Sequence, residues 1–421
     1  MNFIKFQKTF LSYLTQQNLV KEPKNLYEPI DYILHLGGKR VRPILTLMAA
    51  DIFSDEYEKA LPAAFAIEMF HNFTLVHDDI MDDAPLRRGK ETVHEKWDLN
   101  TGVLSGDAML ILAYQYFENY SPEVFQQLAK LFSKTAIEVC DGQQLDIDFE
   151  TRNDVTIPEY IKMISLKTSV LIGAALQMGA IVANAPTEEA QKLYDFGLNL
   201  GIAFQLQDDY LDTFGDPKTF GKQVGGDIIE NKKTYLYLKA LETATTKDKE
   251  SLFNLYNSIA VNNDHKIKSV KELFNKNEST KHIKNQINKY TDVALGTIAP
   301  SQTIATGNTV YTPTQEGDHE LIYAVSSSQL DPVLRNNYSD TVKFAVSDSV
   351  YAHDHHITSF QNWGFPAGTN DVQNVSIAII DIRIDFFMIK ILQHFYSTST
   401  SSQCMRSVWW LIIFHEPFSF L

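Results

Sequence analysis

The sequence has little of several features that define common classes of protein. Its 421 residues include only two cysteines, Cys140 and Cys404, which form neither a disulfide framework nor, by themselves, a four-ligand zinc site. No apolar run approaches the ~20 residues of a membrane-spanning helix. Lys5, Gln7 and Lys8 interrupt the apolar N-terminus, so it is no signal-peptide core. A net charge of −15 argues against a general nucleic-acid binder. These absences predict a soluble cytoplasmic protein without a transmembrane segment.

Charged residues are unevenly distributed along the chain. Asp, Glu, Lys and Arg number 73 in residues 1–299, about 24%, but only 16 in the last 122 residues, about 13%. The second stretch also holds three of the four tryptophans and only two lysines. Because so sharp a shift marks a boundary, we expect a first domain over residues 1–298 and an atypical tail over residues 299–421. The shortage of lysine favours a disordered or poorly packed tail, or translation in a wrong frame, over an appended domain.

Apolar residues in the first part recur at helical spacing, for example over Leu128–Val139. Residues 170–185 are rich in Ala, Leu and Met, as in buried helices. Helix starts are indicated at Thr156–Pro158 and Ala185–Glu188, where a capping residue or proline precedes an acidic first turn. Regular strand alternation is absent before residue 299. We therefore expect an all-α domain of ten or more helices.

Two acidic motifs of the form DDxxD, Asp78–Asp82 and Asp208–Asp212, stand at the ends of apolar helical patterns. On a helix, positions i and i+4 share a face about 6 Å apart, so the first and last aspartates of each motif converge. Converging carboxylates repel each other unless a cation lies between them. Oxygen-only ligands suit Mg²⁺, which keeps some waters and bridges to phosphates. One such motif is most simply a solvated helix end, but two copies in this setting predict a metal site.

Short basic segments accompany the acidic motifs. Gly37–Pro43 has the sequence GGKRVRP, whose glycines would let the backbone approach an anion. Arg87, in LRRG, follows Asp82 by five residues. Lysine offers phosphate a point charge and arginine a planar fork. An acidic site flanked by cations suits a metal–diphosphate complex, in which the acids hold the metal and the cations hold the remaining oxygens.

Six motifs, in chain order, resemble those of the trans-isoprenyl diphosphate synthases, the polyprenyl synthetase family: GGKRVRP, HNFTLVHDDIMD, LRRGKETVH, KTSVL, FQLQDDYLD and FGKQVGGDIIENKKT. The resemblance covers about residues 5–298. It implies the isoprenoid synthase fold, all-α helices around a central cleft, usually as a homodimer. It also implies a Mg²⁺-dependent prenyltransferase that condenses isopentenyl diphosphate with an allylic diphosphate by head-to-tail trans elongation. Three ions are expected, with Mn²⁺ as a possible substitute.

The resemblance assigns roles to the matching positions. The metal ligands it implies are Asp78, Asp82 and Asp208. The other catalytic residues it implies are Asp79, Asp209, Asp212 and Lys167. The allylic diphosphate is assigned to Arg87, Lys167, Thr168, Gln205, Lys222 and Lys232. Isopentenyl diphosphate is assigned to Lys39, Arg42, His71 and Arg88. A further family motif near the cleft is matched by Gln143 and Asp146.

The residues just before the first acidic motif predict the product length. Thr74 and Phe73 stand four and five positions before Asp78, so they would lie about 6 and 7.5 Å from it along the helix. A bulky ring can block a growing chain because close-packed interiors yield little. In the family, a single aromatic residue at the fifth position resembles the C20 type. Geranylgeranyl diphosphate is therefore expected as the product, with farnesyl diphosphate (C15) as the alternative.

Two other functions stay open at this point. A class I terpene cyclase also ionises a diphosphate, but usually replaces the second DDxxD with an Asn/Ser/Glu-type triad. A non-catalytic subunit of a hetero-oligomeric synthase tends to lose one aspartate motif, whereas this chain keeps both. Asn231 stands where the family often has glycine, a mild departure because Asn tolerates left-handed backbone. After Ile298 the family's last helix gives way to the tail. Cys140 is expected to be buried packing.

Overall fold

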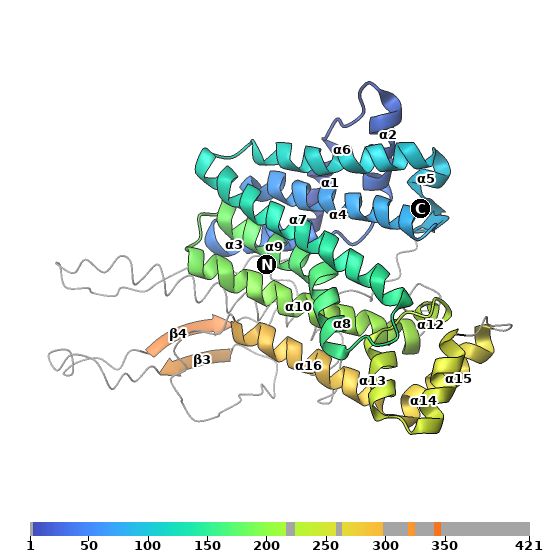
Figure 1. The fold of residues 1–421 in the computed structure, drawn as a ribbon. Helices are drawn as coiled ribbons and strands as arrows, with labels where there is room; N and C mark the ends of the chain where they lie inside the picture. Colours follow the sequence, from blue (N-terminus) through green and yellow to red (C-terminus); the bar gives the residue numbers. More distant parts are fainter. Residues whose placement is uncertain (1–2, 216–223, 258–262, 298–318, 325–340, 347–421) are drawn as a thin grey trace. The chain divides into compact units, whose positions relative to one another are not determined.

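The computed structural model describes most of the chain before residue 298 and two short strands after it: residues 3–215, 224–257, 263–297, 319–324 and 341–346. The first three of these segments are mainly helical, which confirms the expected all-α fold (Figure 1). The chain divides into two compact units, residues 1–299 with 374–421 and residues 300–373.

The helices of the described residues all belong to the first unit. Those of the N-terminal half are α1 (Phe3–Thr15), α2 (Lys24–His35), α3 (Val41–Phe53), the 3₁₀ turn η1 (Tyr57–Ala60), α4 (Leu61–Met81), α5 (Val93–Lys96), α6 (Leu99–Phe117) and α7 (Pro122–Thr151). Those that follow are α8 (Ile157–Ile164), the π-helical turn η2 (Ser165–Ser169), α9 (Val170–Val182), α10 (Thr187–Phe214), α12 (Gly226–Ile229), α13 (Tyr235–Thr243), α14 (Thr246–Asn257), α15 (Asn263–Lys276) and α16 (Ser279–Thr297).

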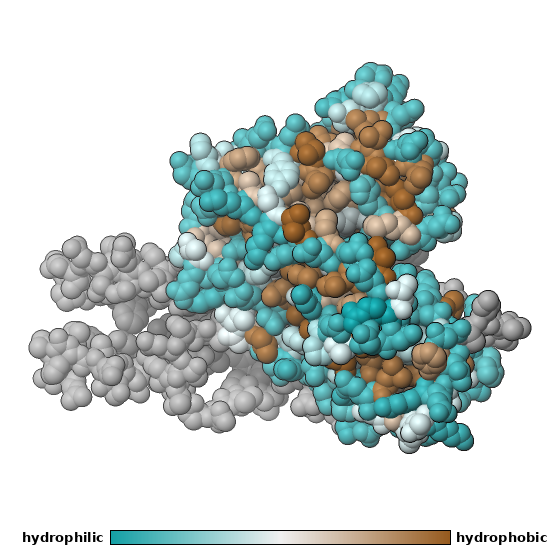
Figure 2. Space-filling view, viewed as in Figure 1, coloured by the Kyte–Doolittle hydropathy of each residue, from teal (hydrophilic) through white to brown (hydrophobic). Residues whose placement is uncertain are grey.

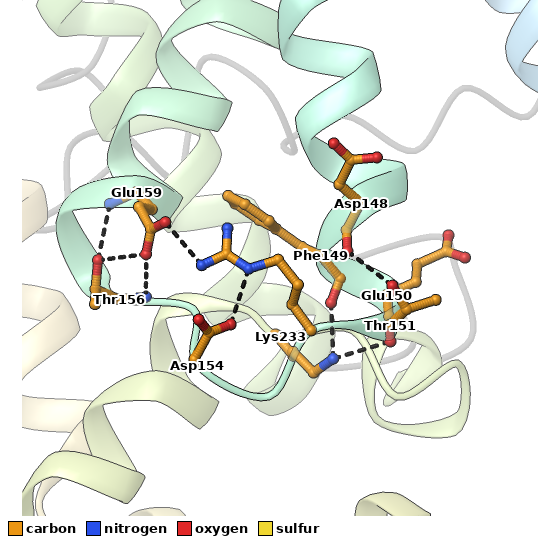
Figure 3. Close-up of polar contacts among 9 residues, drawn as sticks. Asp148, Phe149, Glu150, Thr151, Asp154, Thr156, Glu159 and Lys233 are labelled. Atoms are coloured by element: carbon orange, nitrogen blue, oxygen red, sulfur yellow. Dashed lines mark hydrogen bonds and ion pairs between the residues drawn. The ribbon is translucent and has the colours of Figure 1, made fainter.

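Both predicted helix starts are confirmed. Thr156 caps α8: its hydroxyl accepts from the Glu159 N–H (3.4 Å), and the Glu159 carboxylate accepts from the Thr156 N–H (2.8 Å), which makes a capping box (Figure 3). α10 begins after Pro186 with Glu188 and Glu189 in its first turn. Acidic side chains there are favoured by the positive end of the helix dipole.

The helices α3, α9 and α10 pack with little space between their backbones. A Cβ on Gly179 of α9 would lie 2.0 Å from the carbonyl oxygen of Thr46 in α3. A Cβ on Gly197 of α10 would lie 2.7 Å from the Cα of Gly173 in α9. Both contacts require glycine, because any side chain would collide with backbone. They fix the position of α10, which carries the second aspartate motif.

The expectation that no apolar run approaches the length of a membrane span is wrong for one helical stretch, Ile157–Val182, which is long and apolar enough to cross a membrane by length and composition. It consists of α8, η2 and α9. Of its most apolar window, 72% is buried inside the fold. The stretch is therefore accounted for as a core element of the helical domain.

Two short strand pairs were not expected from the sequence. β1 (Leu86–Arg87) pairs antiparallel with β2 (Lys90–Glu91). The turn between them has positive φ at Arg88 (53°) and Gly89 (73°), the pattern of a two-residue type I′ hairpin. Strands of two residues are too short to show alternation, which is why the sequence predicted none here. In the second unit, six-residue strands also pair antiparallel: β3 (His319–Ala324) and β4 (Thr341–Val346).

Apart from these two strands, the atypical tail lies outside the described residues. Its expected disorder or poor packing, and the boundary between residues 298 and 299, stay predictions.

The expectation that Cys140 is buried is wrong, because its side chain is exposed on α7. The inner face of α7 at this level is formed by Val139 and Gly142. Since neighbouring positions on a helix point about 100° apart, Cys140 falls outside that face.

Candidate active site

The first aspartate motif ends α4, as predicted. Asp82 is the C-cap residue, and its N–H donates to the carbonyl of Asp78 (2.9 Å). Asp79 is only 1% exposed and accepts bonds of 2.6–2.8 Å from the Arg87 guanidinium. Charge-assisted, two-pronged pairing of this kind orients both side chains. Asp79 is thus engaged with Arg87, while Asp78 and Asp82 share the other face of the helix end.

The second motif lies near the C-terminal end of α10 and repeats this division. Asp209 is 3% exposed and accepts a bond from the Tyr160 hydroxyl and another from Gln205 Nε2 (3.2 Å). Burial raises the pKa of Asp209 well above its ordinary value. Gln205 in turn accepts from the Thr168 hydroxyl (3.3 Å). In both motifs the second aspartate is buried and bonded to neighbouring side chains, and the first and last are more exposed.

Lys167 pairs with one acidic residue and acts on the first motif. Its ammonium lies 2.5 Å from Asp146 of α7. Burial and neighbouring charges, that of Asp146 among them, raise the pKa of Tyr160, whose hydroxyl donates to Asp209 in the second motif. Burial raises the pKa of Asp78 to about 6, although Lys167 works in the opposite direction. A carboxylate whose charged form is disfavoured in this way is stabilised by an added cation.

The backbone that carries Lys167 and Thr168 is irregular. Ser165–Ser169 form a π-helical turn between α8 and α9. Such turns are rare and often occur at functional sites. Gly142 of α7 packs directly against this turn, since a Cβ there would lie 2.2 Å from the Lys167 backbone nitrogen. Lys167 and Thr168 are therefore positioned by backbone contact with α7 as well as by their side-chain bonds.

Asp227 extends the acidic cluster and was not singled out from the sequence. It lies in the first turn of α12, and its N–H donates to Asp212 Oδ2 (3.0 Å). Burial and the charge of Asp212 raise the pKa of Asp227 to about 7. Gly225, two positions earlier, has a left-handed φ of 88°, which glycine adopts without steric cost. The two glycines before this aspartate were the available sequence clue.

The neighbouring lysines 232 and 233 differ in their contacts. Lys233 Nζ donates to the carbonyls of Phe149 (2.7 Å) and Glu150 (2.9 Å) near the end of α7 (Figure 3). A cation satisfies the open carbonyls of a helix C-terminus. Lys232 instead forms an ion pair with Glu230 (2.8 Å), and the charge of Asp227 acts on it as well. Lys233 thus fastens this segment to α7, and the assignment of Lys232 to the allylic diphosphate stays a prediction.

Cations expected to bind isopentenyl diphosphate gather around His71. Arg42 Nη1 lies 3.2 Å from His71 Nε2. Because arginine only donates, Nε2 accepts and the proton sits on Nδ1. Burial, then the charges of Arg42 and Arg88, hold the pKa of His71 well below its ordinary value, so the ring is neutral. Arg88, at the hairpin tip, donates to the Gly37 carbonyl. A Cβ on Gly38 would lie 2.8 Å from the guanidinium carbon of Arg88. The glycine loop and the hairpin are thereby brought together.

Two further cations were predicted for the diphosphates. Lys39 is exposed in the same glycine loop, and Lys222 lies outside the described residues. Arg40, between Lys39 and the start of α3, is a structural residue. Its guanidinium is buried and lies 2.5 Å from the carboxylate of Glu68 in α4. This buried pair ties the glycine loop to the helix that carries the first motif.

The chain-length candidates lie on α4 before the first motif. The Thr74 hydroxyl donates to the carbonyl three residues earlier (2.8 Å). The ring centroid of Phe73 lies 5.4 Å from that of Phe70 and 4.8 Å from that of His77. Phe70 in turn packs edge-on against Phe132 of α7 (5.1 Å). The partly buried Phe73 is thus a member of an aromatic cluster between α4 and α7.

The site therefore combines two halves. One holds the clustered acids of α4, α10 and α12 with Lys167. The other holds Arg42, Arg88 and the neutral His71. An acidic half of this kind suits a metal-bound diphosphate, and a basic half suits a diphosphate that carries no metal.

Known proteins are similar to this chain in sequence and in fold. The polyprenyl synthetase family model matches residues 23–275, more than half of the chain. The geranylgeranyl diphosphate synthase of Methanosarcina mazei is 41% identical over 231 residues, which are 54% of this chain and 71% of that protein. The geranylfarnesyl diphosphate synthase of Natronomonas pharaonis is 40% identical over 245 residues, 54% of this chain and 72% of that protein. A crystal structure of a geranylgeranyl pyrophosphate synthase has a TM-score of 0.69 and 54% identity, over 71% of this chain and 92% of that one.

The chain belongs to the polyprenyl synthetase family. It is a transferase that lengthens prenyl diphosphates, which confirms the predicted reaction class. The comparisons support neither a terpene cyclase nor a non-catalytic subunit. The family uses isoprenyl diphosphate substrates and a divalent metal. The clustered acids fit such an ion, since all their donors are oxygens and the pKa values of Asp78 and Asp227 are raised.

Proposed function

We propose that the chain is a Mg²⁺-dependent geranylgeranyl diphosphate synthase. It adds isopentenyl diphosphate to an allylic diphosphate, head to tail and with trans geometry, until the product reaches C20. The observation that supports this most is the presence of two DDxxD motifs beside a separate basic cluster around His71. The acidic half suits a diphosphate that is bound through metal, and the basic half suits a diphosphate that carries no metal.

We propose Mg²⁺ as the metal, with three ions expected and Mn²⁺ able to replace them. Asp78, Asp82 and Asp208 would hold it, and Asp212 and Asp227 would add charge nearby. When bound, the metal neutralises the departing diphosphate, so that the allylic C–O bond ionises more readily. Oxygen-only ligands favour Mg²⁺ over softer ions.

The chain's own side chains bind and orient both substrates. Residues proposed to hold the allylic diphosphate or close over it are Arg87, Lys167, Thr168, Gln205, Lys222 and Lys232. Residues proposed to hold isopentenyl diphosphate are Lys39, Arg42, His71 and Arg88. The neutral ring of His71 can donate a hydrogen bond through Nδ1. Fixed donors and charges of this kind hold the reacting carbons close together and exclude water from the allylic carbocation.

Turnover assays with labelled isopentenyl diphosphate test this function. With Mg²⁺ and each allylic primer of five, ten or fifteen carbons, we expect label to enter C20 products, and chelation of the metal should abolish incorporation. Release of diphosphate without incorporation would instead indicate a cyclase. Activity that appears only with a second subunit would indicate the non-catalytic role. Products that accumulate at C15 or C25 would overturn the C20 assignment while leaving the reaction class intact.

We also propose that the enzyme is a homodimer. Large apolar side chains are exposed on two neighbouring helices: Leu104 (59%) and Ile111 (60%) on α6, and Ile137 (64%) on α7. Leu104 and Ile111 are seven residues apart and so lie on one face of α6. Figure 2 shows apolar surface over these helices. Exposed apolar patches of this kind mark interaction surfaces.

Placing glutamate at both Leu104 and Ile111 should convert the dimer to a monomer, because two charges would be buried in the interface. Light scattering coupled to size-exclusion chromatography measures the mass of each species. Ile4→Glu, at a 48% exposed position on α1, is the matched control and should remain dimeric. A monomeric parent protein, or a double variant that stays dimeric, would refute this interface.

Residues 299–421 are proposed to add nothing to catalysis, because every assigned site residue precedes residue 235. Truncation after Ile298 should therefore keep specific activity within about twofold. Circular dichroism should be recorded together with activity, so that a truncation that has lost its fold is recognised. A folded truncation that has lost most of its activity would show that the tail supplies part of the enzyme.

We further propose a cytoplasmic location. The proposal is supported by the burial of the apolar stretch Ile157–Val182 inside the fold. It is also supported by the acidic composition and the near absence of cysteine. Cell fractionation with an antibody to the chain tests it, and recovery in the membrane fraction after a salt wash would contradict it.

A further inference from the structure

A second group of metal-ligating side chains lies outside the two aspartate motifs. Asp83 follows the end of α4 with a left-handed φ of 48°. His94 and Glu95 lie in the short helix α5. One ligand atom from each of the three side chains lies within 4.8 Å of the other two. Neighbouring ligands of a tetrahedral zinc ion, with bonds of about 2.0–2.1 Å, are about 3.4 Å apart, so only small side-chain movements separate this group from a binding geometry.

His94 is the residue that points to a metal ligand. Its side chain is only 9% exposed, and its Nε2 lies 3.8 Å from the Glu95 carboxylate. Among the residues that the structure describes, neither ring nitrogen has a hydrogen-bond partner. Buried polar atoms are nearly always bonded, and a neutral imidazole is the commonest metal ligand in proteins. A buried imidazole of this kind beside two carboxylates is therefore better explained by metal ligation than by packing.

We propose that Asp83, His94 and Glu95 bind a divalent transition-metal ion of the Zn²⁺ type. Imidazole nitrogen suits Zn²⁺ and related ions, whereas sites made only of oxygens suit Mg²⁺. The mixed donor set thus separates this site chemically from the aspartate motifs. Water would complete the coordination on the exposed side, where Asp83 and Glu95 face solvent.

The position of the site suggests what the ion does. Asp83 precedes the β1–β2 hairpin and His94 follows it, so an ion joins the two ends of the segment that carries Arg87 and Arg88. The same ends are already tied by a hydrogen bond from the Thr92 hydroxyl to the Ala84 carbonyl (2.8 Å). The ion acts as a staple at the base of the hairpin. Metal binding itself does not depend on the proposed function.

The test measures Zn²⁺ binding to the full-length protein in a large excess of Mg²⁺, by equilibrium dialysis and elemental analysis. We expect one tightly held Zn²⁺ per chain, and a rise in melting temperature of several degrees when it is added. Asp83→Asn and Glu95→Gln should each weaken binding by tenfold or more. Both changes suit the fold, because asparagine tolerates left-handed backbone and the Glu95 side chain is 49% exposed. Glu91→Gln, in the same segment but outside the group, is the matched control and should bind like the parent.

Co²⁺ provides an independent readout. An ion bound through imidazole with few ligands absorbs visible light more strongly than one in an octahedral oxygen site, so the parent should show a band that Glu95→Gln lacks. Equal Zn²⁺ binding by the parent and both site variants would overturn the proposal. So would a parent that holds no Zn²⁺ in excess Mg²⁺, or equal loss of binding in Glu91→Gln.

Discussion

Replacing Asp78, Asp82 or Asp208 with alanine is expected to lower turnover by about 10²–10³-fold or more with little loss of folding. The reason is that these carboxylates are proposed to hold the metal that stabilises the leaving diphosphate. They are less buried than Asp79 and Asp209, so we expect their removal to disturb the packing little. Steady-state kinetics at saturating Mg²⁺ and both substrates measures the change.

One of these variants, Asp78→Ala, carries a second prediction, for the stability of the fold. Burial raises the pKa of Asp78 from 3.8 to about 6. Between these values the folded protein binds more protons than the unfolded chain, so its stability falls as the pH rises through this window. At pH 7 without metal, Asp78→Ala should therefore be as stable as the parent or more stable, by up to roughly 3 kcal/mol. The difference should vanish below pH 3.8, the ordinary pKa of the group.

A carboxylate elsewhere on α10 provides the control. Glu188 lies in the first turn of the helix with its side chain 80% exposed. Glu188→Ala should keep normal turnover and show no gain in stability above pH 6. Near-normal turnover in any of the three motif variants would exclude that residue from the metal site.

Replacing Phe73 with alanine is expected to shift the products beyond C20, and Thr74→Phe to shorten them. Phe73 lies about 7.5 Å along α4 from Asp78, within an aromatic cluster that holds its ring in place. Removing the ring opens space that a longer chain can fill, because the surrounding close-packed side chains do not collapse fully. A ring at position 74 would instead block the chain one turn below the metal site. Chromatography of the dephosphorylated products shows the distribution.

Phe73→Tyr keeps the ring and should give the same product chain lengths as the parent. It therefore shows whether loss of the ring, rather than any substitution at position 73, lengthens the products. Melting temperatures identify a variant that has merely lost packing. An unchanged distribution in a folded Phe73→Ala protein would show that Phe73 is ordinary core and that another residue stops elongation.

Most of the fold follows from local patterns in the sequence. The capping box at Thr156 and the acidic first turn after Pro186 are short-range features, and both mark helix starts correctly. The left-handed backbone at Asn231 (φ 60°) also agrees with its expected tolerance. The helix ends that carry the aspartate motifs were predicted for the same reason, since the apolar periodicity runs directly into them.

Contacts between distant segments were harder to predict. The pairing of Asp79 with Arg87 requires the tight turn at Arg88 and Gly89, which no strand pattern announces. The bond between Tyr160 and Asp209 joins α8 to α10, so neither residue alone indicates it. The exposure of Cys140 depends on which face of α7 points into the fold. Because α7 mixes polar and apolar residues, the sequence does not identify that face.

The contact between Gly142 and the π-helical turn has a consequence for how the chain tolerates sequence variation. A library of all single substitutions, selected for prenyl transfer, should reject even alanine at position 142, because the added methyl would displace the backbone under Lys167. Glycine there would behave like an active-site residue although it offers no functional group. Compensating changes would have to come from Ser165–Ser169, so the two segments should vary together among descendants of this sequence.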